Sequence, residues 1–234
     1  MTAEQLCTQA WDNSYSRNEN FLFSPGDEVI RFVARYLRRR VDVDTILNIA
    51  TSAGDSRVLD VGCGIGRNIL FGANMGLDMY GNDLSSTAVA KAVNWLSAQL
   101  QQDMTKKIIA SDIRTLPWEK NFFDHAMSDS VLDSMSFEVA QAGVADVARV
   151  MKSGGYFYCS LISGDETGRD SNFCDEQLVD GKHEKDTIQS YFNHTKVKRL
   201  LEPIFEILDC SLTQIKNPVK NTHHGRWHVI SRRR

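Results

Sequence analysis

The middle of the chain alternates short apolar runs with stretches whose apolar residues return at helical spacing. Strands are predicted at residues 57–61, 78–83, 107–112, 122–130 and 154–163, and helices at residues 67–76, 85–102 and 137–151. In the predicted helices the apolar residues recur every three or four positions, as they do on one helix face. Strands this apolar, with helices between them, are typical of a parallel sheet covered on both faces. The pattern therefore predicts an α/β fold with a doubly wound sheet.

The two flanks of this region follow other patterns. Residues 24–41 predict an amphipathic helix, with Arg38 to Arg40 at its solvated end and a phosphate-binding patch as the alternative role for these arginines. Residues 164–186 are polar and too long for an ordinary connection, which predicts a functional insertion. A short strand, a helix with Thr195 as its cap and two further strands are then predicted at residues 187–192, 194–205, 206–216 and 225–233. This order predicts a terminal hairpin that ends an otherwise parallel sheet with one antiparallel strand.

Length and composition limit the classes of function. The 234 residues suit one α/β domain with modest additions, which we divide into an N-terminal helical lid segment (1–45) and a main domain (46–234). The formal net charge is -3, from 27 basic and 30 acidic residues, so no global positive field favours nucleic acid as a partner. The five cysteines are scattered and form no CxxC motif, which argues against a disulfide framework and a thiolate metal site. We therefore expect no metal.

The sequence also bears on location and assembly. The first twenty residues contain no basic stretch that leads into an apolar core, and no segment approaches 18 continuous apolar residues. We therefore expect a cytoplasmic protein without a membrane partner. A homodimer stays open as an assembly.

Three alternating glycines follow the first predicted strand in the segment DVGCGIGRN. A dinucleotide-binding fingerprint would place its third glycine at the position of Arg67, so the spacing departs from that of dehydrogenases. Gly62, Gly64 and Gly66 nevertheless allow a tight turn whose amides approach a ligand closely. Asp60, at the edge of this turn, would repel a pyrophosphate but attract an ammonium group. The loop therefore predicts a cationic ligand.

Two more aspartates end the second and third predicted strands. Asp83 is placed to accept hydrogen bonds from both hydroxyls of a ribose, as an acid about 20 residues beyond a glycine loop does. Asp112 can accept a hydrogen bond from an exocyclic amine such as that of adenine. Turn formation or helix capping is the alternative role for each of these aspartates. An amine, a ribose and an adenine together describe S-adenosylmethionine.

Residues 57 to about 163 resemble the class I S-adenosylmethionine-dependent methyltransferases. The matching segments are VLDVGCGIGRN, GNDLS, SDIRTLPW followed by FDHAMSDSVLDSM, and VARVMKSGGYFYCSLIS. The resemblance implies that residues 46–234 form a methyltransferase domain with a Rossmann-like, mostly parallel seven-stranded sheet, an antiparallel last strand and S-adenosylmethionine as cofactor. The cofactor-binding residues that it implies are Asp60, Gly62 and Gly64 at the methionine end, Gly66 in the turn, Asp83 at the ribose, Leu84, Asp112 and Ile113 around the adenine, and Ser128 beneath the methionine.

The acceptor is less constrained, because methyl transfer is an in-line displacement at an already activated methyl group. No covalent enzyme nucleophile is required, and a general base helps mainly when the acceptor is a hydroxyl. The segment SDSV lacks the Asn-Pro-Pro-Tyr type of motif that this family uses on amide or adenine nitrogens, and no cysteine pair suits methylation of a ring carbon. Small hydroxyls and amines remain as acceptors, and the candidate catalytic residues are His125, Asp129 and His183.

Segments outside the resemblance are candidates for the walls of the acceptor site. In this family a segment before the first strand often folds over the cofactor and substrate, so Trp11, Tyr15 and Arg17 are lid candidates, and Arg67 is a further candidate for binding the substrate. The carboxylates, amides and arginines of the N-terminal segment and of residues 164–186 favour a polar acceptor, such as a sugar or another metabolite methylated on oxygen or nitrogen.

Two other functions stay open at this point. One is a protein or RNA methyltransferase, for which the arginine runs 38–40 and 232–234 are the supporting feature. The other is a non-catalytic protein that binds S-adenosylmethionine. A nicotinamide-dependent dehydrogenase is disfavoured by Asp60 and Arg67.

Overall fold

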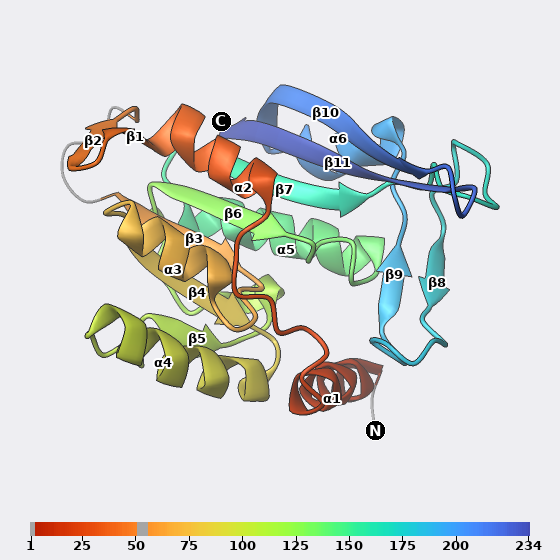
Figure 1. Cartoon of the computed structure of the whole chain (residues 1–234), viewed down its shortest axis with the longest axis horizontal. Coiled ribbons are helices and arrows are strands. Elements are labelled where there is room, and N and C mark those ends of the chain that lie inside the picture. The colour runs from red at the N-terminus through yellow and green to blue at the C-terminus, as the bar shows by residue number, and fades with distance from the viewer. Residues whose placement is uncertain (1–2, 51–55) are drawn as a thin grey trace.

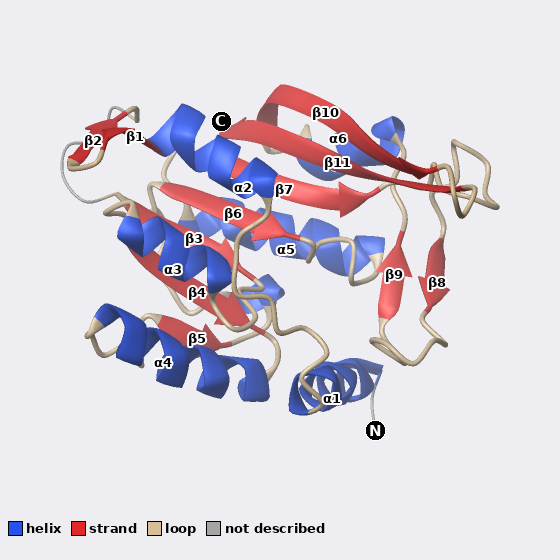
Figure 2. Cartoon of the chain, in the orientation of Figure 1, coloured by secondary structure: helices blue, strands red, loops and turns tan. Residues whose placement is uncertain are grey.

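A seven-stranded sheet with helices on both faces forms the body of the protein (Figures 1 and 2). The structure is a computed structural model and describes residues 3–50 and 56–234. The strand order is β10-β11-β7-β6-β3-β4-β5. The strands are β3 (Arg57–Val61), β4 (Asp78–Asp83), β5 (Ile108–Ala110), β6 (His125–Asp129), β7 (Tyr156–Ile162), β10 (Phe205–Asn217) and β11 (Thr222–Arg233). The doubly wound α/β fold predicted from the sequence is confirmed.

The direction and order of the strands determine where a site can form. Strands β3 to β7 are parallel to one another, and β11 is antiparallel to both of its neighbours, β7 and β10. Strand β11 therefore runs against the other six, as predicted for the last strand. The chain leaves β3 toward β4 and β5 on one side and later returns to β6 and β7 on the other. Open α/β sheets bind their ligands at such a switch point, beyond the carboxyl ends of the strands.

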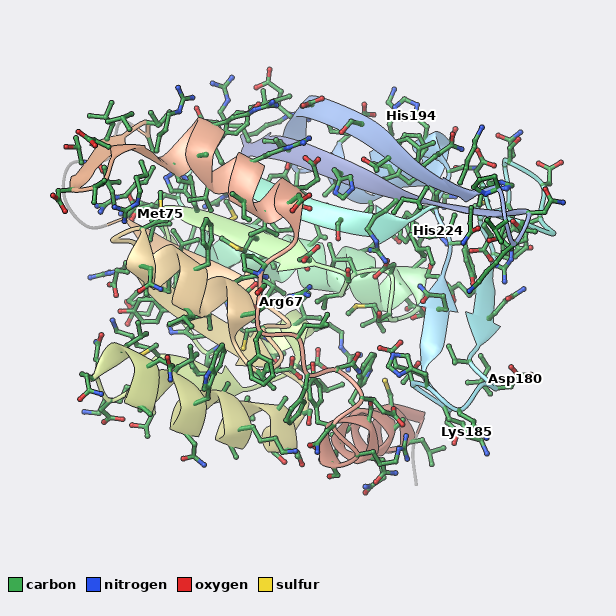
Figure 3. All side chains as sticks on the ribbon, viewed as in Figure 1. Arg67, Met75, Asp180, Lys185, His194 and His224 are labelled. Atoms are coloured by element: carbon green, nitrogen blue, oxygen red, sulfur yellow. The ribbon has the colours of Figure 1, made fainter. Side chains whose placement is uncertain are left out.

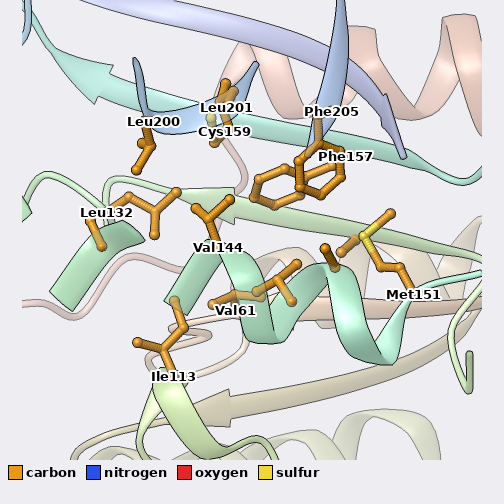
Figure 4. Close-up of a cluster of buried hydrophobic side chains, with 14 of the residues drawn as sticks. Val61, Ile113, Leu132, Val144, Met151, Phe157, Cys159, Leu200, Leu201 and Phe205 are labelled. Atoms are coloured by element: carbon orange, nitrogen blue, oxygen red, sulfur yellow. The ribbon is translucent and has the colours of Figure 1, made fainter. Parts of the chain in front are cut away.

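The sheet has a hydrophobic core on each face, because successive side chains along a strand point to opposite faces. Val58 and Tyr158 lie in the core on one face, and Leu59 and Phe157 lie in the core on the other. The first core is covered by α2 (Asp27–Phe32), the π-helix Val33–Leu37, α3 (Arg67–Asn74) and α4 (Ser86–Leu100). The second is covered by α5 (Phe137–Val150) and α6 (His194–Leu201), and part of it is drawn in Figure 4.

Side-chain caps set the starts of the helices. Ser85 accepts a hydrogen bond from the amide of Ala88 (3.1 Å), so α4 begins directly after it. Helix α6 is capped by Asn193 instead of the predicted Thr195. Asn193 is extended and its side-chain oxygen accepts from the amide of Lys196 (2.8 Å), so the helix begins before Thr195 is reached.

The predicted helix over residues 24–41 is wrong in its last part. The helical segment ends at Leu37, and Arg38–Asp42 forms β1, which pairs antiparallel with β2 (Thr45–Asn48). Extended backbone is favoured here by Val41, Val43 and the segment Thr45–Asn48, since β-branched residues fit strands better than helices. Arg38 to Arg40 therefore do not form the charged end of a helix.

Two added segments stand at the edge where the parallel strands end (Figure 1). Helix α1 (Ala3–Ser16) packs against α4. Within the insertion, β8 (Glu176–Leu178) and β9 (Ile188–Ser190) form an antiparallel hairpin, which we call the insertion hairpin. The division at residue 45 and the lid role of the first segment stay predictions. In the part of the chain that the structure describes, no helix is both long and apolar enough to cross a membrane.

Candidate functional site

A cavity of about 390 Å³ lies beyond the carboxyl ends of β3, β4, β5 and β6. Its floor is made of the residues that directly follow these strands, and its walls include side chains from α1 and from the insertion hairpin. The lining residues are 61–65, 67–68, 82–84, 111–114, 129–131 and 134–136 beyond the strands of the sheet, and Cys7, Thr8, Trp11, Tyr15, Asn20, Leu22, Val139, Glu184 and Ile188 from elsewhere. The cavity therefore occupies the switch point of the sheet.

The glycine loop forms part of the floor. Gly62 and Gly64 line the cavity with positive φ angles of 67° and 55°. A side chain is excluded at Gly62, where an added Cβ would lie 2.5 Å from both methyl groups of Val131. Gly66 does not line the cavity. It precedes α3 with a φ of 90°, and a Cβ there would lie 2.3 Å from Leu96, so this glycine allows α3 and α4 to pack closely.

Asp83 links the glycine loop to the end of β4. Its carboxylate accepts hydrogen bonds from the amides of Gly64 and Ser85, both at 2.9 Å. Burial raises the pKa of Asp83 to about 6, so the group is mostly ionised at neutral pH. Asp83 and Leu84 both line the cavity. An anionic acceptor is thus held rigidly at the position predicted to bind the ribose.

The residues predicted to surround the adenine also line the cavity. Ile113 contributes a buried apolar surface. Asp112 forms an ion pair with Arg114, with a shortest distance of 2.6 Å, and the hydrogen bonds from that guanidinium hold the pKa of Asp112 below its usual range. Asp112 is therefore already partnered, and any bond to an adenine amine uses a remaining lone pair of its carboxylate.

Asp60 lies behind the cavity wall and not on it. Its side chain is almost fully buried, and one oxygen accepts a hydrogen bond from Asn68 (3.3 Å). Asn68 itself lines the cavity and was not predicted from the sequence; its position one residue after Arg67, in the first turn of α3, is the signal that was available. Asp60 is therefore connected to the cavity through its hydrogen bond with Asn68, and it does not line the cavity itself.

Burial of Asp60 predicts an unusual pH dependence of stability. Burial raises the pKa of Asp60 to about 7 in the folded protein, whereas an unfolded chain has a value of about 3.9. The folded state therefore binds more protons between these values, and the free energy of unfolding falls with rising pH by up to about 1.4 kcal/mol per pH unit. Asp60→Asn should remove this contribution, so the stability of the variant relative to the wild type should rise with pH up to about pH 7.

The comparison is made by urea denaturation of both proteins between about pH 5 and 8. The difference curve is informative because His125, whose pKa is lowered to about 4 by burial, acts in the opposite direction in both proteins. A stability difference that does not change with pH would show that Asp60 is ionised throughout.

Several polar atoms around the cavity lack a hydrogen-bond partner among the residues that the structure describes. They are Oδ1 of Asn68, Oδ1 of Asn82 and Oγ of Ser111, all buried and all on cavity-lining residues, together with Oδ2 of Asp60. An unsatisfied buried polar atom costs about 1–3 kcal/mol, so a ligand that donates hydrogen bonds there would be favoured. The amine, hydroxyl and ammonium donors of S-adenosylmethionine match these acceptors. Asn82 and Ser111 were not predicted from the sequence.

Arg67 and Asp129 form an ion pair on the cavity wall. The two side chains are 2.8 Å apart, and Arg67 lies between α3 and the segment that joins α1 to α2 (Figure 3). The second oxygen of Asp129 accepts a hydrogen bond from Ser160 (2.7 Å). Both carboxylate oxygens are therefore engaged, so Asp129 lines the site as the partner of Arg67 and not as a free base.

The structure does not bring three other candidates to the cavity. His125 is at the amino end of β6, at the opposite edge of the sheet, where it stacks on Tyr156 and accepts a hydrogen bond from its amide (3.1 Å). Ser128 is fully buried and points to the other face of β6 from Asp129. The side chain of His183 is 61% exposed and outside the cavity, whose lining includes the next residue, Glu184, instead.

The N-terminal candidates separate into two groups. Trp11 and Tyr15 line the cavity, and the Tyr15 hydroxyl lies 2.7 Å from the position of a Cβ built on Gly64, so the phenol covers the glycine loop. Arg17 is not part of the lining. It is half-exposed and forms an ion pair with Glu19 at 2.6 Å, because α1 ends one residue before it and the chain turns away.

Asp12 attaches α1 to the rest of the protein. Its Oδ1 accepts hydrogen bonds from the Ser85 hydroxyl (2.6 Å) and the Thr87 amide (3.1 Å) at the start of α4. We expect Asp12→Ala to lower the free energy of unfolding by about 1–2 kcal/mol and to increase proteolysis within α1 under native conditions. Asn13→Ala is the matched control, since the Asn13 side chain accepts a hydrogen bond from Gln9 within α1. Equal proteolysis of the two variants would contradict this role of Asp12.

Comparisons with known proteins agree with this geometry. A family model described as a methyltransferase domain matches residues 59–159. No curated protein sequence matches the chain significantly. Solved structures with a similar fold include an S-adenosylmethionine-dependent methyltransferase from Methanosarcina mazei, with 20% identity, a TM-score of 0.63 and coverage of 78% of this chain and 94% of that one.

Two further structures contain the cofactor or its product. One is 1,6-didemethyltoxoflavin-N1-methyltransferase from Burkholderia thailandensis with S-adenosylhomocysteine, at 19% identity, a TM-score of 0.56 and coverage of 76% and 71% of the two chains. The other is magnesium protoporphyrin IX methyltransferase from Synechocystis with S-adenosylmethionine, at 14% identity, a TM-score of 0.65 and coverage of 99% and 98%. The matched domain contains the glycine loop, Asp83 and Asp112. Residues 59–159 therefore form a methyltransferase domain, and the chain shares the fold of S-adenosylmethionine-dependent methyltransferases.

Proposed function

We propose that the protein transfers the methyl group of S-adenosylmethionine to an oxygen or nitrogen atom of a polar small molecule. The observation that carries this proposal is the shared cavity, whose lining runs from Asp83 and Asp112 on the sheet to Glu184 on the insertion hairpin. A cavity with walls on both sides suits a small acceptor better than a polymer. Two structural neighbours are also named as methyltransferases of small molecules.

The cofactor would be held by the residues of the floor. Asp83 is the acceptor for the ribose hydroxyls, and Asn82, Ser111 and Ile113 surround the adenine. Asn68 supplies an unpaired oxygen for the methionine ammonium, and Asp60 lies behind it. When bound, S-adenosylmethionine supplies a methyl group that its sulfonium already activates. The contribution of the protein is to align the acceptor atom with the carbon–sulfur bond.

The general bases that the described lining of the cavity offers are weakly basic carboxylates. This lining contains no histidine among the described residues, and both oxygens of Asp129 are engaged. This supports an acceptor whose nucleophile needs no strong base, such as a neutral amine nitrogen or an acidic hydroxyl. The lone pair of the acceptor forms the bond to the methyl carbon, the carbon–sulfur electrons remain on sulfur, and the acceptor proton passes to water.

The test measures formation of S-adenosylhomocysteine from S-adenosylmethionine with separate panels of acceptors. The panels are sugars, amines and amino acids on one side, and RNA and protein on the other. We expect turnover with members of the first group. Turnover with RNA or protein alone, or cofactor binding without turnover on any panel, would overturn the proposal.

A further inference from the structure

The charges on the cavity wall are unevenly paired. The described lining carries four carboxylates and two guanidinium groups. Arg67 pairs with Asp129 at 2.8 Å and Arg114 pairs with Asp112 at 2.6 Å, so both cations are used. Asp83 and Glu184 are the two lining carboxylates left without a cationic side chain from Lys or Arg. The backbone amides of Gly64 and Ser85 satisfy Asp83, which leaves Glu184.

Glu184 is held on the wall from several directions. Its carbonyl accepts hydrogen bonds from the amide (3.1 Å) and the hydroxyl (2.7 Å) of Thr187, and its own amide donates to the carboxylate of Glu19 (3.2 Å). The last bond joins the insertion hairpin to the segment that follows α1. Glu184 therefore belongs to an ordered part of the wall, opposite the floor that is predicted to bind the cofactor.

The carboxylate of Glu184 has few groups to balance its charge. The ring of His183 lies 3.6 Å from it and is mostly exposed. Lys185 is exposed and lies at the outer tip of the insertion hairpin, together with Asp180 (Figure 3). Among the described residues, no Lys or Arg forms an ion pair with Glu184. A partly buried carboxylate without a counterion favours a cationic ligand.

A charge balance extends this argument to the acceptor. S-adenosylmethionine carries one net positive charge, because its sulfonium and ammonium outweigh one carboxylate. The two carboxylates without a cationic partner carry two negative charges, and bound S-adenosylmethionine balances one of them. One negative charge therefore remains on the cavity wall when the cofactor is bound. We propose that Glu184 binds an ammonium group of the acceptor, and that the acceptors are amine-bearing polar small molecules. This inference rests on the proposed function.

The paired ammonium cannot itself be the methylated atom while it keeps its proton, since it has no lone pair. The nucleophile is therefore a second group of the same molecule, a hydroxyl or a neutral amine. Glu184 then acts as an anchor for specificity and does not take a proton from the reacting atom. Its loss should raise KM for a cationic acceptor and change kcat much less, as expected for binding that is equal in the ground and transition states.

The test compares Glu184→Gln with the wild type, using probes that differ only in charge. The probes are amino sugars and their N-acetylated counterparts, which lack the cation, titrated into protein saturated with S-adenosylhomocysteine. We expect the wild type to bind the amino sugars about tenfold more tightly than the acetylated forms, and Glu184→Gln to lose that preference. Asp180→Asn removes one negative charge from the same hairpin outside the cavity, and should keep the preference.

The affinity for S-adenosylhomocysteine is measured on the same proteins. It should be equal in Glu184→Gln and the wild type. A matching loss of this affinity would overturn the inference, because Glu184 would then bind the methionine ammonium of the cofactor. Absence of a charge preference, including the absence of binding by every pair, would also overturn it. Turnover of uncharged polar acceptors would in that case leave the proposed function standing, whereas absence of turnover on every panel would remove both.

Discussion

Gly64→Val should weaken the binding of S-adenosylhomocysteine by at least about 100-fold, which corresponds to nearly 3 kcal/mol. Gly64 lines the cavity with a φ of 55°, a conformation in which a β-branched residue is strained. Its Cβ would lie 2.7 Å from the hydroxyl of Tyr15, and the two methyl groups of valine would extend into the space where a ligand must approach the loop amides. Titration calorimetry with the purified variant measures the loss.

A control is needed, because a positive φ destabilises any non-glycine residue. Gly154→Val provides it, since Gly154 has a φ of 81° and no atom lies within 4 Å of its added Cβ. This variant should lose a similar amount of stability and bind S-adenosylhomocysteine normally. If Gly64→Val is folded and its dissociation constant stays within about threefold of the wild-type value, the ligand does not approach this loop.

Asp83→Ala should weaken the binding of S-adenosylmethionine and S-adenosylhomocysteine by about 1–3 kcal/mol, or roughly 5- to 150-fold. The substitution removes the anionic acceptor predicted to bind the ribose hydroxyls. It also leaves the amides of Gly64 and Ser85 without their acceptor, so the glycine loop loses one of its attachments to β4. Calorimetric titration with each ligand gives the two affinities.

Asp83→Asn separates these contributions. Asparagine keeps one side-chain oxygen that can accept a hydrogen bond from a loop amide, and it removes the charge. The affinity of Asp83→Asn for the ligand should therefore fall between the affinities of the wild type and Asp83→Ala. Unchanged affinity in both variants would remove Asp83 from the cofactor site. If Asp83→Asn and Asp83→Ala lose the same amount of affinity, the whole effect comes from the charge of Asp83.

The floor of the site could be predicted from the sequence because local order determines it. Gly62 and Gly64 directly follow β3, Asp83 ends β4 and Asp112 follows β5. The carboxyl ends of neighbouring parallel strands meet at one edge, so their residues converge whatever the rest of the chain does. The same argument places His125 at the amino end of β6, away from the cavity, since it is the first residue of that strand.

The walls could not be predicted in the same way, because tertiary contacts determine them. Whether α1 presents Tyr15 or Arg17 to the cavity depends on the attachment of Asp12 to the start of α4, about 70 residues away in sequence. Glu184 reaches the wall through a contact with Glu19, which no spacing in the sequence reveals. Asn68 is different, since its place in the first turn of α3 was visible beside Arg67.

The place of β11 inside the sheet has a consequence for synthesis on the ribosome. Residues 226–232 of β11 pair with β7, although β7 precedes them by more than 60 residues. While translation has not yet passed residue 232, β7 offers an unpaired edge on which another nascent chain can add a strand. Slow codons or a stalled ribosome within the last forty residues of this sequence should therefore promote aggregation far more than a pause in β4 or α4, which complete their contacts with β3 early.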